Sequence, residues 1–222
     1  MTWSVERFVE PASTFHARSV PDPTIRAIWV CEPVGPALVL GSAQPADVAS
    51  AAACRMAGVE VVRRRSGGGA VLIEPGSTLW LDVLLPSGDV LWDPDVGRSF
   101  GWLGEVWAGA LGALGVDATV HAGPPVRSRW SDLVCFAGLG PGELTDRRGR
   151  KVVGMSQRRT RAAARFQCAV PGAWDPVPLL ELLTLDDDER AGAVAELADV
   201  AAGPDVSASD LLSAFLARLP RT

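Results

Sequence analysis

Short apolar runs, separated by glycine, proline and charged residues, fill the first three quarters of the chain. Runs of about four to eight residues that are rich in β-branched and aromatic side chains are typical of strands. The pattern predicts a strand and then a broken helix within residues 3–20. It predicts further strands at 25–31, 36–41, 59–65, 70–73, 78–85, 117–121, 133–136, 143–145, 151–156 and 166–170.

Apolar residues recur at helical spacing in two stretches of this region, 46–57 and 96–114. In the second stretch Phe100, Leu103 and Trp107 would share one face of a helix. After about residue 174 the chain becomes rich in Leu and Ala, with acidic residues at the starts of the apolar segments. This change predicts helices at 177–184, 187–201 and 208–218.

Together these elements predict a fold of the α/β (α+β) class. We expect a mixed β-sheet with packed helices over residues 1–172. We expect residues 173–222 to form a small helical C-terminal extension. A length of 222 residues suits one domain with such an appendage.

Composition and charge restrict the possible partners. The 48% apolar and 21% charged residues are ordinary for a soluble globular protein, and a net charge of −5 argues against broad nucleic-acid binding. No apolar run reaches about 18 residues, and the N-terminus lacks the pattern of a secretory signal. We therefore expect a cytoplasmic protein with neither a membrane nor a nucleic-acid partner. The four cysteines are widely spaced and only two histidines are present, so we expect no metal site.

One basic residue differs from all the others. Lys151 is the only lysine among 21 Lys and Arg residues, and Tyr and Asn are absent, as a GC-rich genome would explain. A lysine retained under that pressure can be one that arginine cannot replace, because its ammonium is compact and its stem is flexible. The alternative is a lysine that survived by chance on a solvated hairpin. Composition alone leaves both interpretations open.

A glycine-rich loop provides a second candidate for chemistry. Residues 63–71 read Arg-Arg-Arg-Ser-Gly-Gly-Gly-Ala-Val between two predicted strands. The glycines let a ligand approach the backbone closely, consecutive N–H groups favour an anion, and arginine pairs with carboxylate or phosphate. The segment matches neither the phosphate-binding loop nor the dinucleotide fingerprint. The alternative is a flexible turn with solvated arginines.

Cys135 is a third candidate, because it precedes a loop of glycine and proline at 138–142. An exposed cysteine near arginines can have a lowered pKa and act as an acyl-accepting nucleophile. The alternative is a small buried residue in a strand. His121, the histidine nearest in sequence, is better interpreted as a satisfied loop residue.

The glycine loop and the lysine segment together resemble the lipoate–protein ligase A family, which belongs to the biotin/lipoate A/B protein ligase superfamily. The resemblance rests on Arg64 to Val71, followed about 80 residues later by Gly149 to Arg158, and it covers roughly residues 25–172. It implies a mixed sheet with helices packed around it. The order and spacing of the two motifs and the lone lysine make the match specific.

The resemblance implies an enzyme that uses ATP and Mg²⁺ to activate lipoate or octanoate as an acyl-AMP. The acyl group then passes to a lysine of a lipoyl carrier domain, either the glycine cleavage H protein or a 2-oxoacid dehydrogenase E2. Lys151 would contact the activated acyl group in this family. The implied substrate-binding residues are Arg64, Arg65, Ser66, Gly67, Gly68, Gly69, Ala70, Val71, Gly154 and Ser156. Val71, Leu72 and Trp80 would line the acyl tunnel.

Some residues depart from the ligase pattern. Ligases usually continue the glycine loop with Phe-His-Asp, where this chain has Leu72-Ile73-Glu74. Cys135-Phe136, with Glu143 before the lysine, instead looks like the octanoyltransferases of the superfamily, which use a cysteine thioester and no ATP. We place the ligase first because the Ser-Gly-Gly-Gly-Ala-Val loop is complete. The transferase is the second hypothesis, and a non-catalytic acyl-binding relative is the third.

Overall fold

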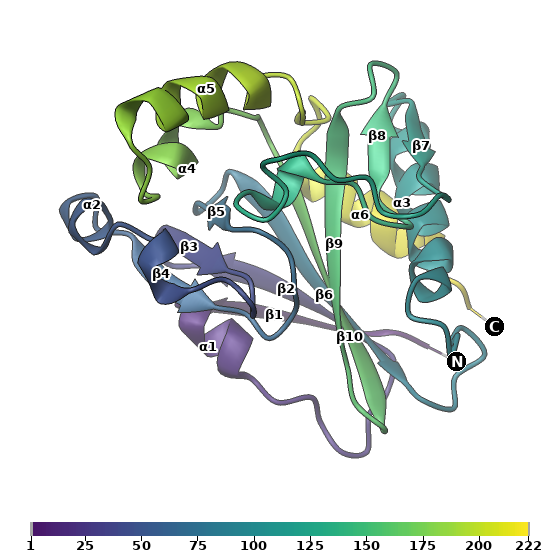
Figure 1. Ribbon diagram of the computed structural model, residues 1–222. Helices are drawn as coiled ribbons and strands as arrows, with labels where there is room; N and C mark the ends of the chain where they lie inside the picture. The colour runs from purple at the N-terminus through teal and green to yellow at the C-terminus, as the bar shows by residue number, and fades with distance from the viewer. Residues whose placement is uncertain (1, 222) are drawn as a thin grey trace.

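A computed structural model describes residues 2–221 of the chain, which form two β-sheets with helices on the outside (Figure 1). The larger sheet has seven strands in the order β1-β2-β6-β10-β9-β8-β7. β1 runs parallel to β2, and the other neighbouring pairs are antiparallel. In sheet order the strands are β1 Ser4–Glu10, β2 Ala27–Pro33, β6 Thr78–Pro86, β10 Ala163–Pro171, β9 Lys151–Arg159, β8 Leu144–Asp146 and β7 Ala118–Val120.

The smaller sheet has three strands in the order β4-β3-β5. β3 is parallel to β4 and antiparallel to β5. Its strands are β4 Glu60–Arg63, β3 Ala37–Leu40 and β5 Val71–Ile73. The predicted mixed sheet with packed helices is therefore confirmed, with a second sheet in addition.

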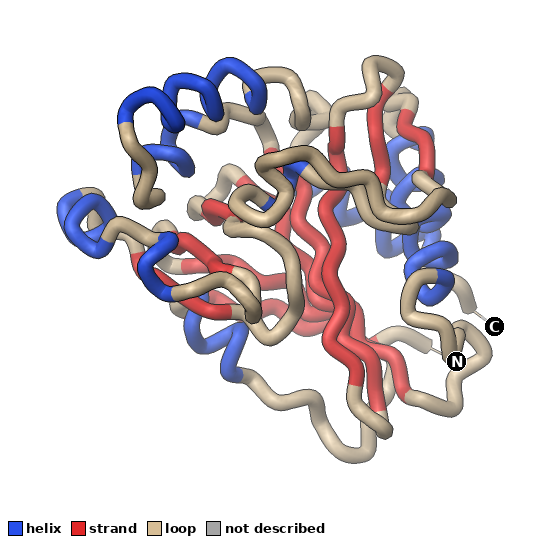
Figure 2. Tube along the Cα trace, viewed as in Figure 1, coloured by secondary structure: helices blue, strands red, loops and turns tan. Residues whose placement is uncertain are grey.

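Within residues 2–221, six α-helices and three short 3-10 helices connect and cover the sheets (Figure 2). The α-helices are α1 Ala12–Ala17, α2 Ala51–Met56, α3 Gly101–Ala113, α4 Val177–Glu181, α5 Asp187–Leu197 and α6 Ala208–Arg218. The 3-10 helices are Ala46–Val48, Arg98–Phe100 and Cys135–Ala137. None of the helices within residues 2–221 combines the length and apolar character needed to cross a bilayer.

β6 lies inside the larger sheet and is covered on both faces, which explains its continuous apolar run. Successive side chains of a strand point to opposite faces. Leu81 and Val83 belong to the apolar cluster that includes residues of α3 and α6. Trp80 and Leu84 belong to the cluster on the other face, with residues of α1 and of the smaller sheet. The space between the two sheets is therefore lined by one face of β6.

The helices after residue 173 pack into the same apolar clusters as the sheets. On α6, the ring of Phe215 is fully buried and lies 4.3 Å from the ring of Trp107 in α3, centroid to centroid. Leu180 of α4 and Leu197 of α5 are buried in a cluster with Leu38 of the smaller sheet. The C-terminal helices therefore cover surfaces that the sheets would otherwise expose.

Two local predictions need correction. Residues 133–136 do not form a strand: Leu133 and Val134 precede the 3-10 helix Cys135–Ala137. A short apolar run cannot distinguish a strand from a buried loop, because both place apolar side chains inside. The predicted helix 46–57 is divided into the 3-10 helix and α2, and Ser50 caps α2 by accepting from the N–H of Ala53.

A buried ion pair near the chain termini gives a test of the fold. Arg26 Nε and Nη2 donate to the two carboxylate oxygens of Asp89, both at 2.6 Å, and the side chains are 1% and 0% exposed. Asp89→Ala would leave the guanidinium buried and unpaired, which costs about 3–5 kcal/mol of unfolding free energy. Asp93→Ala removes a half-buried partner of the exposed Arg98 and should cost less than about 1 kcal/mol. Urea denaturation of both variants measures the difference, and equal costs would contradict the prediction.

Candidate functional site

The glycine loop, residues 66–70, is packed against the segment that leads to Cys135. The N–H of Cys135 donates to Ala70 O at 2.9 Å, and Ala70 forms a parallel bridge with Val134. A Cβ added to Gly69 would lie 2.6 Å from backbone atoms of Val134, so a larger residue could not make this approach. The loop therefore has a fixed position beside Cys135.

Arg64 holds the glycine loop from the inside and is only 4% exposed. Its Nη2 donates to Gly67 O at 2.8 Å and to Gly69 O at 2.9 Å. The same nitrogen lies 3.8 Å from Sγ of Cys135. The guanidinium thus brings a fixed positive charge next to the thiol, where it would stabilise negative charge that develops on sulfur.

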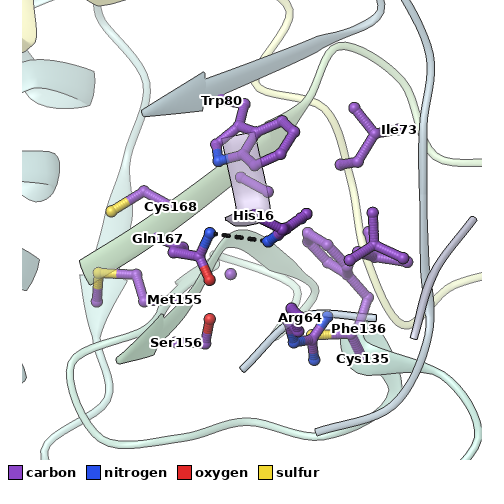
Figure 3. Close-up of a pocket in the computed structure, with 14 residues that line it drawn as sticks. His16, Arg64, Ile73, Trp80, Cys135, Phe136, Met155, Ser156, Gln167 and Cys168 are labelled. Carbon is purple, nitrogen blue, oxygen red and sulfur yellow. Dashed lines mark hydrogen bonds between the residues drawn. The ribbon is translucent and has the colours of Figure 1, made fainter. Parts of the chain in front are cut away.

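A narrow apolar cavity, the inter-sheet cavity, lies between the two sheets next to the thiol (Figure 3). Five of the residues singled out in the sequence contribute to its wall: Arg64, Val71, Cys135, Gly154 and Ser156. Trp80, expected in the acyl tunnel, lines it as well, whereas Leu72 lines a neighbouring cavity of about 470 Å³. The two cavities share Val71, Phe136 and Ala169, so they adjoin. The inter-sheet cavity has a free volume of only about 40 Å³, so a bound acyl group would move side chains or extend into the larger cavity.

Lys151 lies behind this wall, at the start of β9, and is 3% exposed. Its Nζ pairs with the Glu143 carboxylate at 2.7 Å and donates to Cys135 O at 3.2 Å and to Gly138 O at 2.9 Å. The ammonium also lies 5.1 Å from the centre of the Phe136 ring. Three acceptors match the three N–H donors of an ammonium. The lysine is therefore not solvated; it is held by the loop that carries Cys135.

Glu143 connects this loop to β9. One carboxylate oxygen accepts from the N–H of Gly140 at 2.6 Å and the other from the N–H of Met155 at 2.7 Å. The carboxylate thus uses both oxygens on backbone donors in addition to Lys151. A buried charge with this many partners is held in one position.

A chain of buried polar groups crosses from β6 and β10 to α1 beside the cavity. Arg165 Nε donates to Asp82 at 2.8 Å, and Gln167 Nε2 lies 3.3 Å from Nδ1 of His16. Burial raises the pKa of Asp82, and hydrogen bonds from Arg165, Trp80 and Gln167 oppose that shift. Burial, with the charges of Arg165 and Arg64, lowers the pKa of His16 to about 3. The imidazole is therefore neutral at physiological pH.

Ser66 and Ser156 meet at the edge of the cavity, with their Oγ atoms 3.0 Å apart. This contact joins the glycine loop directly to β9. Arg65 does not join them: it lines a different cavity together with Arg158 and Arg18. Gly68 lies at the loop apex with a φ of +98°.

Sequence reasoning missed His16 and Gln167 as cavity residues. His16 belongs to a helix of six residues, and Gln167 lies in a strand that was predicted only from its apolar neighbours. No motif surrounds either residue. His16 reaches the cavity through the packing of α1 against the sheets, which spacing along the chain does not encode, and Gln167 reaches it from β10.

Two facing sheets that enclose an apolar cavity, a glycine loop and a buried lysine define a catalytic domain of the biotin/lipoate ligase superfamily. The family model for the lipoyl protein ligase A/B catalytic domain matches residues 13–214, and the chain belongs to that family. No curated protein sequence gives a significant match.

Solved structures of lipoate ligases share the fold. A bipartite lipoate protein ligase of Thermoplasma acidophilum, described with its E2 lipoyl domain, has a TM-score of 0.77 at 18% identity, covering 98% of this chain and 82% of that chain. Lipoate-protein ligase A bound with ATP has a TM-score of 0.69 at 17% identity, covering 98% and 84%. Protein Ta0514 of T. acidophilum with bound lipoic acid has a TM-score of 0.66 at 17% identity, covering 92% and 75%. At these identities the likeness establishes the fold.

Replacing Lys151 by Arg tests whether the site needs an ammonium. The guanidinium keeps the charge but is too broad for acceptors arranged around one nitrogen. We expect acyl transfer to fall roughly 100-fold, because the loop that carries Cys135 would be displaced, and the melting temperature to fall as well. The matched control is Arg150→Lys at the neighbouring half-buried position, paired with Asp146, which should keep both properties. Unchanged transfer by Lys151→Arg would contradict the role assigned to the ammonium.

Proposed function

We propose that this chain attaches a lipoyl or octanoyl group to a lysine of a lipoyl carrier domain. The observation that carries the proposal is the inter-sheet cavity, which has apolar walls and the thiol of Cys135, Arg64 and Ser156 on its surface. An aliphatic acyl chain suits apolar walls, and its carbonyl end suits the polar groups. The carrier would be the glycine cleavage H protein or a 2-oxoacid dehydrogenase E2.

The relatives support the same substrates. Structures with this fold are described with bound lipoic acid, with ATP and with an E2 lipoyl domain. We extend lipoate and a lipoyl domain to this chain because it belongs to the same catalytic-domain family. The acyl group could be activated by either of two routes.

The first candidate route is that of a ligase, which activates the acid with ATP and Mg²⁺ as an acyl-AMP. The family and the ATP-bound relative support it. The conformation described here fits a nucleotide poorly at Lys151, because Glu143, Cys135 O and Gly138 O already take its three donors. A phosphate at this lysine would have to displace one of those acceptors.

The second candidate route, an ATP-independent transfer through Cys135, is favoured by the position of the thiol. Sγ of Cys135 would attack the carbonyl carbon of an acyl thioester, so that a new C–S bond forms and the old one breaks. The departing thiolate takes up a proton. The amine of the carrier lysine would then attack the Cys135 thioester, forming the amide and returning the sulfur with its proton. Arg64, 3.8 Å from Sγ, would stabilise the thiolate in both steps.

Two parallel assays separate the routes. One supplies lipoate, ATP and Mg²⁺, and the other supplies an octanoyl-carrier thioester without ATP, both with a lipoyl domain as acceptor. We expect transfer in the second assay, an acyl adduct on Cys135 by mass spectrometry, and loss of activity by several orders of magnitude in Cys135→Ser. Cys168→Ala is the matched control, because burial raises the pKa of this cavity thiol to about 12 and leaves it protonated.

Two other results of these assays would contradict the thioester route. ATP-dependent pyrophosphate release without a Cys135 adduct would reject the thioester route and support the ligase. Tight binding of the acid with no transfer in either assay would reject both routes and indicate a non-catalytic acyl-binding relative.

A further inference from the structure

His16 occupies a position in the inter-sheet cavity that the proposed chemistry does not use. It is 8% exposed, and its ring lies 4.9 Å from the ring of Trp80 between centroids. In Figure 3 it lies between Trp80 and Gln167, apart from Arg64 and Cys135. Its Nε2 is buried and has no hydrogen-bond partner among the residues that the structure describes. A buried polar atom left without a partner is costly, and because His16 lines the cavity, a ligand there can supply the partner.

The neighbours of His16 determine which of its nitrogens carries the proton. Gln167 lies directly opposite Asp82 in the register of β10 and β6, so its amide faces that carboxyl group, whose pKa it helps to lower. Its Oε1 accepts from Ser66 Oγ at 3.4 Å. The NH₂ group of Gln167 therefore faces Nδ1 of His16, at 3.3 Å, and a neutral imidazole that accepts at Nδ1 carries its proton on Nε2.

The carboxyl group of Asp82 is itself fixed in this orientation. Arg165 donates to it from Nε at 2.8 Å, and Trp80 Nε1 donates to it at 3.0 Å. Because the carboxyl group of Asp82 is an acceptor, the amide of Gln167 does not turn its own oxygen toward it. The low pKa of His16 agrees with a neutral ring, because burial and the charges of Arg165 and Arg64 disfavour a second proton.

We propose that the Nε2–H group of His16 determines acyl specificity, selecting a chain that carries a hydrogen-bond acceptor, the dithiolane of a lipoyl group, over a plain octanoyl chain. The inference rests on the proposed function, since it assumes that the acyl group enters the inter-sheet cavity. An alkyl chain would leave this donor without a partner, as it is in the structure without a ligand, whereas an acceptor would satisfy it. A dithiolane sulfur is a weak acceptor and also makes favourable contacts with aromatic rings, which Trp80 and Phe136 provide.

Binding of the free acids tests the inference without requiring transfer. Calorimetry with lipoic acid and with octanoic acid should show about tenfold tighter binding of lipoic acid to the unaltered protein, equivalent to about 1.4 kcal/mol. His16→Phe keeps a ring against Trp80 but removes the donor, so the preference should disappear, mainly through weaker binding of lipoic acid. His121→Phe makes the same change at a position whose ring contacts Pro124 O outside the cavity, and it should keep the preference.

The protonation of His16 can be measured separately, even where His16→Phe does not fold. The chain has two histidines, so ¹⁵N-labelled His121→Phe has one imidazole. Its spectrum at neutral pH should show a neutral ring protonated at Nε2, and lipoic acid should shift this signal more than octanoic acid does. A ring protonated at Nδ1 would overturn the inference.

The outcomes also separate this inference from the proposed function. Equal affinity for the two acids, unchanged by His16→Phe, would overturn the specificity role while leaving an acyl-binding cavity in place. Failure of the unaltered protein to bind either acid would overturn both.

Discussion

The geometry of the site depends on the burial of a single ammonium group. Nζ of Lys151 is enclosed by the Glu143 carboxylate and by the carbonyls of Cys135 and Gly138. Removing a charge from water costs several kcal/mol unless it is fully paired, so the loop and the strand must take up their positions together. The backbone of Lys151 also bonds to Val200 O and to the N–H of Ala202, which ties the C-terminal segment to the same point.

The buried contacts of Lys151 indicate a structural role for the only lysine of the chain. Its position behind the cavity wall makes it a positioning group for Cys135 in the conformation described, since it holds the carbonyl of that residue. Arg64 binds the glycine loop through Gly67 O. The Ala70 carbonyl of the same loop accepts from the N–H of Cys135. Two buried cations thus fix the backbone around one thiol. An arginine suits the spread carbonyls of the loop, and a lysine suits acceptors that converge on one nitrogen.

The sequence predicted the parts of this site that depend on local chemistry. The glycine run was expected to let a ligand approach the backbone; at Gly69 the close approach is made by the backbone of Val134, whereas a Cβ at Gly67 would meet nothing within 4 Å. The lone lysine is buried, with three acceptors around its ammonium nitrogen, and is not on a solvated hairpin. The run 133–136 was misassigned as a strand because its apolar side chains are buried, whereas its backbone turns into a 3-10 helix. His16 could not be predicted, because only the packing of a six-residue helix brings it to the cavity.

The buried polar side chains between the two sheets, like Lys151, are tolerated because each charge is paired. Asp82 and Arg165 interrupt apolar strands at the cost of desolvation, and an isolated charge there would not be tolerated. Because the two charges are paired, the cavity wall carries no net charge there. The carboxyl group of Asp82 orients the amide of Gln167, and this amide in turn orients the ring of His16. An apolar pair of similar volume could serve stability equally well, but it could not orient an uncharged donor at the side of an otherwise apolar cavity. The buried pair is therefore better explained by the shape and polarity of the cavity than by the stability of the fold.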